Sequence, residues 1–299
     1  MQSSKNWSYR IFNNGDNSDY NAAMVTKTDK NNGICSFLKK LPDYLDTSEL
    51  TKMQSFFQGC YELENIPKID TSNVTTFQSC FAGCSKIKTI PQLNTSKATL
   101  MNMCFSGCSE LESIPIIDTS NVTNFQSCFS ECIKLKSIPQ LNTSKGTSMS
   151  SMFSECKSIE NIPQLDTSNV TSLSNLFYNC TNLKSIPTLN ASKANNIYNI
   201  VSGCKNLTDF NGLIELGKAF TSKSNNYNNY TFNLRSCTNL THESLVNIIN
   251  NLYDLNLTYD TANGGTLYKQ AFQLGKDNLA KLTADEILIA TNKGWNVTE

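Results

Sequence analysis

Histidine, the commonest acid–base catalyst, and arginine, a frequent phosphate ligand, are scarce in this chain. Its 299 residues include one histidine, His242, and two arginines, Arg10 and Arg235, and the formal net charge is zero. Phosphate backbones attract clustered lysine and arginine side chains. Here the basic residues have acidic neighbours, so we expect no nucleic-acid binding.

The usual marks of an active site are missing too. His242 stands just inside an expected helix, where a solvated side chain is the default. No serine or cysteine has a histidine partner that the sequence reveals, and no phosphate-binding or dinucleotide-binding loop is present. We therefore predict that the chain is not an enzyme and needs no cofactor or metal.

Long apolar runs are also absent. No stretch reaches the ~20 apolar residues of a membrane-spanning helix, so we expect no membrane insertion. Residues 1–40 are polar and lack the apolar segment of a secretory signal. The absence of a signal leaves two interpretations, and Met1 favours a complete chain. Either a leader is missing from the sequence, or the protein reaches the outside by cell lysis, as a virion component does.

What the chain does contain is a strict repeat. The phrase Asp-Thr-Ser, or a close variant of it, recurs every 24 residues, beginning at Asp46, Asp70, Asn94, Asp118, Asn142, Asp166 and Asn190. A period of this size predicts stacked structural repeats. We assign seven copies to residues 41–214, an N-terminal cap or attachment segment to residues 1–40, and a C-terminal repeat and cap region to residues 215–299.

Apolar residues recur at fixed positions of the repeat and predict its core. One position reads Phe57, Phe81, Phe105, Phe129, Phe153 and Phe177, and a second reads Cys60, Cys84, Cys108, Cys132, Cys156, Cys180 and Cys204. A third, isoleucine in most copies, is followed directly by proline. One copy is too short to bury these groups alone, so stacking must bury them in one continuous column.

Each copy divides into two arms. Between Val74 and Cys84 the apolar spacing is helical and predicts a short helix or an irregular helical turn. The preceding Thr-Ser supplies hydroxyls that can cap its free amides. Residues 86–91 predict a short strand, which the proline at its end stops. We therefore expect an α/β repeat solenoid, leucine-rich-repeat-like, with seven strand-plus-short-helix repeats, a parallel sheet on one face, and larger strand–helix units at the C-terminus.

Charged residues alternate in sign along the repeat. One position reads Glu64, Lys88, Glu112, Lys136, Glu160 and Lys184, and another reads Glu62, Lys86, Glu110 and Lys134. Opposite charges on neighbouring strands are favourable and like charges are not. The alternation indicates that each residue contacts its equivalent in the next copy, and that the full super-period spans two copies.

At this point the chain resembles a known family. Residues 84–91 (Cys-Ser-Lys-Ile-Lys-Thr-Ile-Pro) and the Asn-Val-Thr-x-Phe-x-Ser-Cys-Phe-x-x-Cys pattern beginning at Asn73 resemble BspA-like leucine-rich repeats. Such repeats occur in bacterial surface proteins and in proteins encoded by phages of gut bacteria. The resemblance covers residues 41–214, and residues 240–245 and 280–295 resemble the usual terminal segment. It implies adhesion or partner binding by a rigid surface, without catalysis.

The C-terminal region carries a second repeat, looser and longer than the first. Residues 231–234 and 271–274 predict matching strands, and residues 242–253 and 284–292 predict helices. Thr283 and Glu286 fit a capping box, and Gly264–Gly265 fits a turn. The polar loop before this region is a plain surface loop or, with Tyr227 and Tyr230, a binding loop.

The twelve cysteines leave three interpretations. Besides the seven at one position, Cys80, Cys104 and Cys128 fill a second position that elsewhere holds other apolar residues, and Cys35 and Cys237 lie outside. Neighbours could form disulfides, or the pairs could hold a metal. We favour reduced core thiols, because free cysteine behaves as a small hydrophobe and a disulfide would bend a uniform stack.

These observations predict a non-catalytic binding or adhesion protein. The expected docking surface is the strand face, formed by Glu64, Lys88, Gln92, Glu112, Ile116, Lys136, Gln140, Glu160, Gln164, Lys184 and Thr188. Ile116, its one apolar member, is the best single contact. The expected partner is a protein or a cell-surface glycan.

Three settings would suit such a protein. The first is a phage virion, on which the chain would be a receptor-binding or host-attachment protein. The second is a bacterial cell surface, where it would be a BspA-like adhesin. The third is a structural virion decoration that contacts other virion proteins through residues 1–40.

Overall fold

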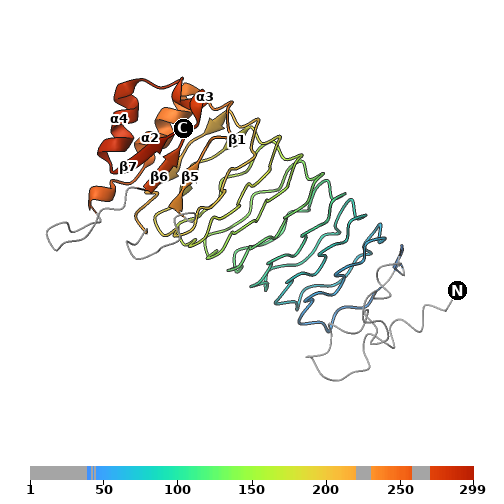
Figure 1. Cartoon of the computed structure of the whole chain (residues 1–299). Coiled ribbons are helices and arrows are strands. Elements are labelled where there is room, and N and C mark those ends of the chain that lie inside the picture. The colour runs from blue at the N-terminus through green and yellow to red at the C-terminus, as the bar shows by residue number, and fades with distance from the viewer. Residues whose placement is uncertain (1–38, 42, 44, 220–229, 258–269) are drawn as a thin grey trace, which may run out of the picture.

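The computed structural model describes residues 39–41, 43, 45–219, 230–257 and 270–299. Successive loops of the chain lie side by side in one elongated stack, and helices α2 (His242–Asn251), α3 (Lys276–Leu279) and α4 (Ala284–Asn292) lie at its C-terminal end (Figure 1). The stacking offset is one sequence repeat: bridges join Thr76 to Leu100 and Leu100 to Asn124 in parallel, and continue in the same steps to Asn196. The chain is therefore a leucine-rich-repeat-like solenoid.

The predicted core columns are present. Six stacked phenylalanine rings, Phe57, Phe81, Phe105, Phe129, Phe153 and Phe177, have neighbouring centroids 5.4–5.8 Å apart and planes within 12° of parallel. Offset stacking of this kind is favourable for aromatic pairs. The buried residues from Leu41 to Trp295 belong to one continuous cluster, so each repeat completes the core of its neighbours.

The short helix expected in each repeat is absent, and of the two expected forms the irregular turn is the one that agrees with the structure. Residues 76–84 form a turn arm of successive turns, and alternate amides point in different directions. Cys80, Ala82 and Cys84 donate to carbonyls three residues back, whereas Phe77, Ser79, Phe81 and Gly83 donate at 2.7–2.9 Å to carbonyls of the next repeat. Helical spacing of the apolar residues survives, but the left-handed backbone at Ser79 (φ 52°) and Gly83 (φ 77°) is incompatible with a helix.

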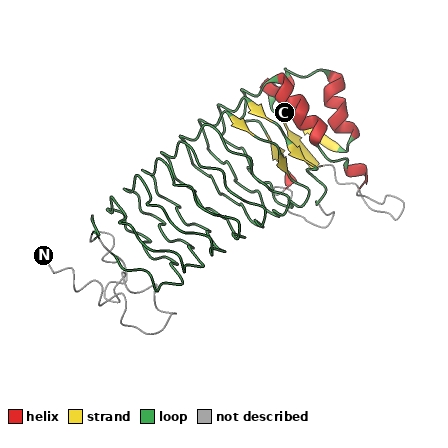
Figure 2. Ribbon diagram, turned by 180° about the vertical axis from the view of Figure 1, so that it is seen from behind, coloured by secondary structure: helices red, strands yellow, loops and turns green. Residues whose placement is uncertain are grey.

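The expected sheet is also reduced. The proline arm, which we call the extended arm, forms strands only near the C-terminal end of the stack (Figure 2). There β1 (Ser185–Ile186) pairs in parallel with β3 (Asp209–Phe210), and β2 (Leu189–Asn190) pairs with β4 (Leu213–Ile214). Elsewhere the arm is bonded sparsely, as at Glu112 N to Lys88 O, because proline supplies no amide donor. The regular inter-repeat ladder lies on the turn arm instead.

The Asp-Thr-Ser phrase joins consecutive repeats. Each threonine is buried, and its hydroxyl donates to a backbone carbonyl 23 residues later, as Thr119 Oγ1 does to Asn142 O at 2.9 Å. The preceding Asp or Asn accepts the amide of the following serine, which closes a local turn. The hydroxyl that we expected to cap a helix therefore holds the stack together.

The cysteine column has a second role besides packing. Cys132 Sγ donates to Phe105 O at 3.1 Å, and Cys84, Cys108, Cys156, Cys180 and Cys204 make the same contact with the phenylalanine 27 residues earlier. At the matching place in the C-terminal unit, Asn278 Nδ2 donates to Leu234 O. These carbonyls also accept a backbone amide, as Phe105 O does from Cys108 N at 3.1 Å, so the side-chain donor supplies a second hydrogen bond to the same oxygen.

The C-terminal unit thickens the stack and was largely predicted. Its elements are β5 (Phe232–Asn233), α2 (His242–Asn251), the 3-10 helix η4 (Leu255–Leu257), β6 (Gln270–Gln273), α3 (Lys276–Leu279), α4 (Ala284–Asn292) and β7 (Trp295–Thr298). Strands β5, β6 and β7 form one parallel sheet in which Phe232 lies opposite Phe272. This register confirms the predicted match between the strands at 231–234 and 271–274.

Helix ends follow the local signals. Thr283 and Glu286 form the predicted capping box of α4, and Thr241 caps α2. Helix α2 ends at Asn251, short of the expected end at residue 253, and neither α3 nor β7 was predicted. The Gly264–Gly265 turn lies outside the described residues.

Candidate functional site

The predicted docking residues lie on the extended arm, and most of them are exposed. Ile116 is 77% exposed, the most exposed of the large apolar side chains described, whereas Thr188 is half-buried. The turn arm on the other side of each loop carries the dense backbone ladder, and the extended arm is the side less occupied by backbone bonding.

Glutamines of this face bind the next repeat. Gln92 Nε2 donates to Ile116 O at 2.7 Å, Gln140 Nε2 to Gln164 O at 2.7 Å, and Gln164 Nε2 to Thr188 O at 2.9 Å. Ile116 occupies the same position of the repeat but has no donor, so this side-chain ladder is interrupted there. The glutamines therefore have a structural role that the sequence prediction missed.

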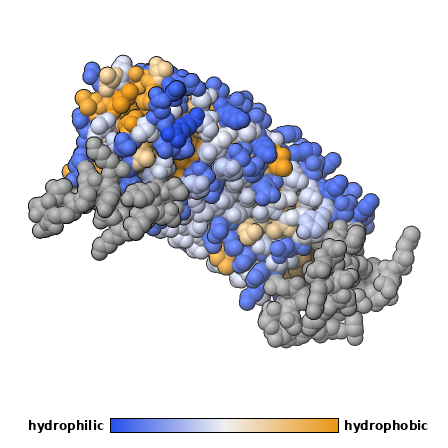
Figure 3. Space-filling model, in the orientation of Figure 1, coloured by the Kyte–Doolittle hydropathy of each residue, from blue (hydrophilic) through white to orange (hydrophobic). Residues whose placement is uncertain are grey.

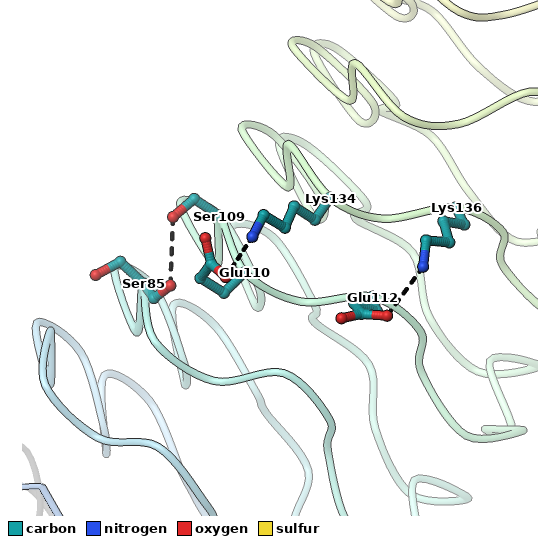
Figure 4. Close-up of polar contacts among 6 residues, drawn as sticks. All are labelled: Ser85, Ser109, Glu110, Glu112, Lys134 and Lys136. Carbon is teal, nitrogen blue, oxygen red and sulfur yellow. Dashed lines mark hydrogen bonds and ion pairs between the residues drawn. The ribbon is translucent and has the colours of Figure 1, made fainter.

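Some of the ion pairs predicted by the charge alternation form across consecutive repeats. Lys136 Nζ lies 3.0 Å from Glu112 Oε2, Lys134 Nζ lies 2.6 Å from Glu110 Oε2 (Figure 4), and Lys184 Nζ lies 2.7 Å from Glu160 Oε2. The hydrogen bond from Lys136 lowers the pKa of Glu112. These pairs are exposed, so they fix register more than they add stability.

Two shallow grooves flank the extended arm. One, of about 710 Å³, is lined by Glu64, Asn65, Ser85, Lys86, Lys88, Ser109 and Glu110. The other, of about 480 Å³, lies among residues 117–119, 140–144, 164 and 166. The predicted contacts Glu64, Lys88, Gln140 and Gln164 therefore line grooves, which the sequence could not show because a groove depends on which side chains pair.

The predicted binding loop is corrected in part. Tyr230 is 7% exposed and belongs to the core cluster, so it cannot serve as an exposed contact. It follows a run of polar residues, which suggested a surface position, but it lies just before the buried strand β5. Tyr227 and residues 1–38 lie outside the described part of the chain.

Potential catalytic groups have structural partners. His242 is exposed, as expected, and its Nε2 lies 2.8 Å from Glu286 Oε1, a contact that joins α2 to α4. Backbone hydrogen bonding from Thr283 lowers the pKa of Glu286. Within the described residues no group of three or more metal-ligating side chains lies close enough to hold a metal ion.

The thiols are buried and, with one exception, reduced. Ten described cysteines are free and buried, which agrees with the favoured interpretation, but Cys60 is disulfide-bonded and departs from it. Burial raises the pKa of Cys108 to about 12 and also that of Cys237 to about 12. Thiols in this state are poor nucleophiles, since the thiolate is the reactive form.

A second surface lies on the C-terminal unit. In the view of Figure 3 the apolar side chains gather over the helices at that end, whereas the rest of the visible surface is mostly polar with isolated apolar residues. Leu288 and Ile289 of α4 are exposed there. None of the described helices has the length and apolar character needed to cross a bilayer.

Several solved structures resemble the chain, among them the following two. A leucine-rich repeat protein from Bacteroides ovatus is 20% identical, with 63% of this chain and 62% of that protein covered and a TM-score of 0.34. A TLR13–ssRNA13 complex is 14% identical, with 66% of this chain and 31% of that chain covered and a TM-score of 0.26. The chain thus spans under two thirds of the length of either protein.

Family comparison gives a more direct assignment. No curated protein matches the sequence. One family model, described as "Mycoplasma protein of unknown function, DUF285", matches residues 21–114 and again residues 101–215, which together make up more than half of the chain and contain the repeats described above. The chain therefore belongs to the DUF285 family.

Proposed function

We propose that this protein is a non-catalytic attachment protein whose extended arm binds a protein or a glycan on a cell surface. The proposal rests on the exposure of Ile116. Its side chain is 77% exposed on a polar face, at a position where glutamine joins three neighbouring repeats. A glutamine there would add a stacking hydrogen bond. An apolar residue in its place suits a contact, because interface centres are apolar and their rims polar.

The rigidity of the stack supports the same proposal. Every repeat is joined to the next by backbone bonds, threonine hydroxyls and buried thiols, so the exposed side chains keep fixed spacings without a partner. A preorganised surface of this kind loses little conformational freedom on binding.

A substitution at Ile116 tests this function. Ile116→Gln places the residue of the neighbouring repeats at this position, and we expect at least a tenfold loss of attachment to intact bacterial cells. The matched control is Met103→Ser on the turn arm, since Met103 is also exposed and Ser79 and Ser127 hold its place in adjacent repeats. Equal attachment by Ile116→Gln and the unchanged protein, with equal melting temperatures, would refute the proposal.

For the setting, we propose a phage virion, on which the chain is a receptor-binding or host-attachment protein. The resemblance of the repeats to phage-encoded BspA-like proteins supports this. A bacterial cell-surface adhesin is the second candidate, and the name of the family, which refers to the cellular organism Mycoplasma, favours it. Mass spectrometry of purified particles and of cell envelopes from the same culture decides between them.

A further inference from the structure

The larger groove is the place where the charge ladder of the extended arm opens. Glu64 and Lys88 occupy equivalent positions of consecutive repeats, as Glu112 and Lys136 do, and Lys86 is related to Glu110 in the same way. The sequence alternation therefore predicts ion pairs here as well. Instead, these side chains line a groove of about 710 Å³.

Pairing differs sharply along the ladder. Lys134 and Lys136 contact Glu110 and Glu112 at 2.6 and 3.0 Å. In contrast, the side chains of Glu64, Lys86 and Lys88 make no ion pair or hydrogen bond to any described residue. Two ammonium groups and one carboxylate are thus left facing the groove, next to the amide of Asn65 and the hydroxyl of Ser109.

An exposed tyrosine precedes this groove along the chain, although its ring lies on Gly59 and Gly83 and is not part of the groove lining. Tyr61 is 54% exposed, and its backbone carbonyl accepts the hydroxyl of Ser85, which lines the groove, at 3.1 Å. The ring lies against Gly59 and Gly83: a Cβ at Gly83 would come within 3.3 Å of it. The same position is also glycine at Gly107 and Gly203, whereas Glu131, Glu155 and Asn179 occupy it in the repeats between them.

We propose that this groove binds a saccharide that carries a carboxylate, such as a uronic or sialic acid unit. The inference rests on the proposed attachment function and names its ligand class. Lys86 and Lys88 bind the carboxylate by charge-assisted hydrogen bonds, while Glu64 and Asn65 accept or donate to ring hydroxyls. The flat C–H face of the sugar packs on Tyr61, whose ring supplies rigid apolar area.

The charge of the site favours an acidic saccharide over a neutral one. Neither Lys86 nor Lys88 forms a contact ion pair with a described residue, although the charge of Lys88 helps to lower the pKa of Glu112. The carboxylate of Glu110, which also lines the groove, is already paired with Lys134. The open groups therefore carry two positive charges against the one negative charge of Glu64. A mixed polar groove beside one aromatic ring also offers less apolar area than a peptide anchor would need.

The test is saturation-transfer NMR of the full chain with 3′-sialyllactose, a hyaluronan tetrasaccharide and lactose, with oligoglutamate as the peptide probe. We expect binding of at least one acidic saccharide with Kd on the order of 1 mM, and much weaker binding of lactose. The double variant Lys86→Gln/Lys88→Gln should lose tenfold or more. Tyr61→Ser, which introduces the residue of the next two repeats, should lose several-fold, and the control Lys134→Gln should bind as the unchanged protein does.

Other outcomes would overturn the assignment. Binding of oligoglutamate alone would make the groove a peptide site, and equal binding of lactose or of the double variant would remove the role of the lysines. Cell attachment measured on the same preparations separates this inference from the proposed function. Attachment that depends on Ile116 without any saccharide binding refutes only the ligand class. Saccharide binding without dependence of attachment on Ile116 refutes only the proposed docking face.

Discussion

At the scale of single residues, the buried cysteines and threonines bind backbone as well as fill space. From the sequence, the cysteine column could be predicted as core, because it lies among apolar positions. Its hydrogen bond could not, since a thiol donor and a small apolar group look alike in a sequence pattern. The contact from Cys132 to Phe105 O explains why this position holds cysteine while the position of Cys80 also takes Met152 and Leu176.

Substitutions at Cys132 separate the two roles. Cys132→Ala removes the thiol and leaves a small cavity, and we expect it to lower the free energy of unfolding by about 1–3 kcal/mol. Cys132→Ser retains a donor of similar size and should lose less. Urea unfolding measures both variants, and a serine variant no more stable than the alanine variant would argue against the hydrogen bond.

Thiol burial also predicts a dependence of stability on pH. Burial raises the pKa of Cys108 from 9.0 to about 12. The unfolded chain then loses thiol protons at a lower pH than the folded chain, so this contribution to stability is complete below about pH 9 and is lost as pH rises towards 12. We expect urea midpoints to fall steadily from pH 8 to pH 10. A constant midpoint would show that the thiols are not protected.

At the scale of elements, the sequence predicted an element correctly where the residues that determine it lie within that element. The capping box at Thr283 predicted the start of α4, since its partner Glu286 lies in the first turn of the same helix. The turn arm was mistaken for a helix because periodicity reports which side chains are buried, whereas the direction of each amide is set by the neighbouring repeat. The expected sheet is smaller than predicted for a related reason: the hydrogen bonds between repeats depend on the backbone amides, and proline removes one of these donors from the extended arm.

A substitution at Thr119 tests the hydrogen bond by which the Asp-Thr-Ser phrase joins consecutive repeats, called the joint below. Thr119→Val keeps the shape but removes the buried hydrogen bond to Asn142 O, and we expect a loss of about 1–2 kcal/mol in the free energy of unfolding. The control is Thr123→Val, whose hydroxyl bonds an exposed carbonyl at 3.3 Å and should cost little. Equal losses at the two sites, measured by thermal unfolding, would count against the joint.

At the scale of the whole molecule, the repeat offset and the sign alternation predicted which residues meet. The sequence could not show where pairing fails, because Glu64 and Lys88 look the same as Glu112 and Lys136 in the pattern. The open groove and the burial of Tyr230 both depend on how particular side chains pack in the folded chain, and the 24-residue pattern does not predict that packing. The candidate face was thus located from sequence, but its most accessible part was not.

Deletions test the super-period of two repeats. Removing residues 119–142 places Glu112 beside Glu160, whereas removing residues 119–166 places it beside Lys184. Like charges repel, and salt screens that repulsion. The shorter deletion should therefore gain stability, relative to the longer one, as sodium chloride is raised. Thermal unfolding between low and high salt measures this, and identical salt responses would contradict the alternation of charge.

The central claim is that the extended arm is the surface that binds. Hydroxyl-radical footprinting of the protein on intact cells, compared with the free protein, tests it most directly. The account predicts protection at Tyr61, Ile116 and the groove residues between Glu64 and Glu110, with Met103 and Tyr198 of the turn arm unchanged. Protection confined to the turn arm, or to Leu288 and Ile289 of α4, would contradict it and move the binding surface elsewhere.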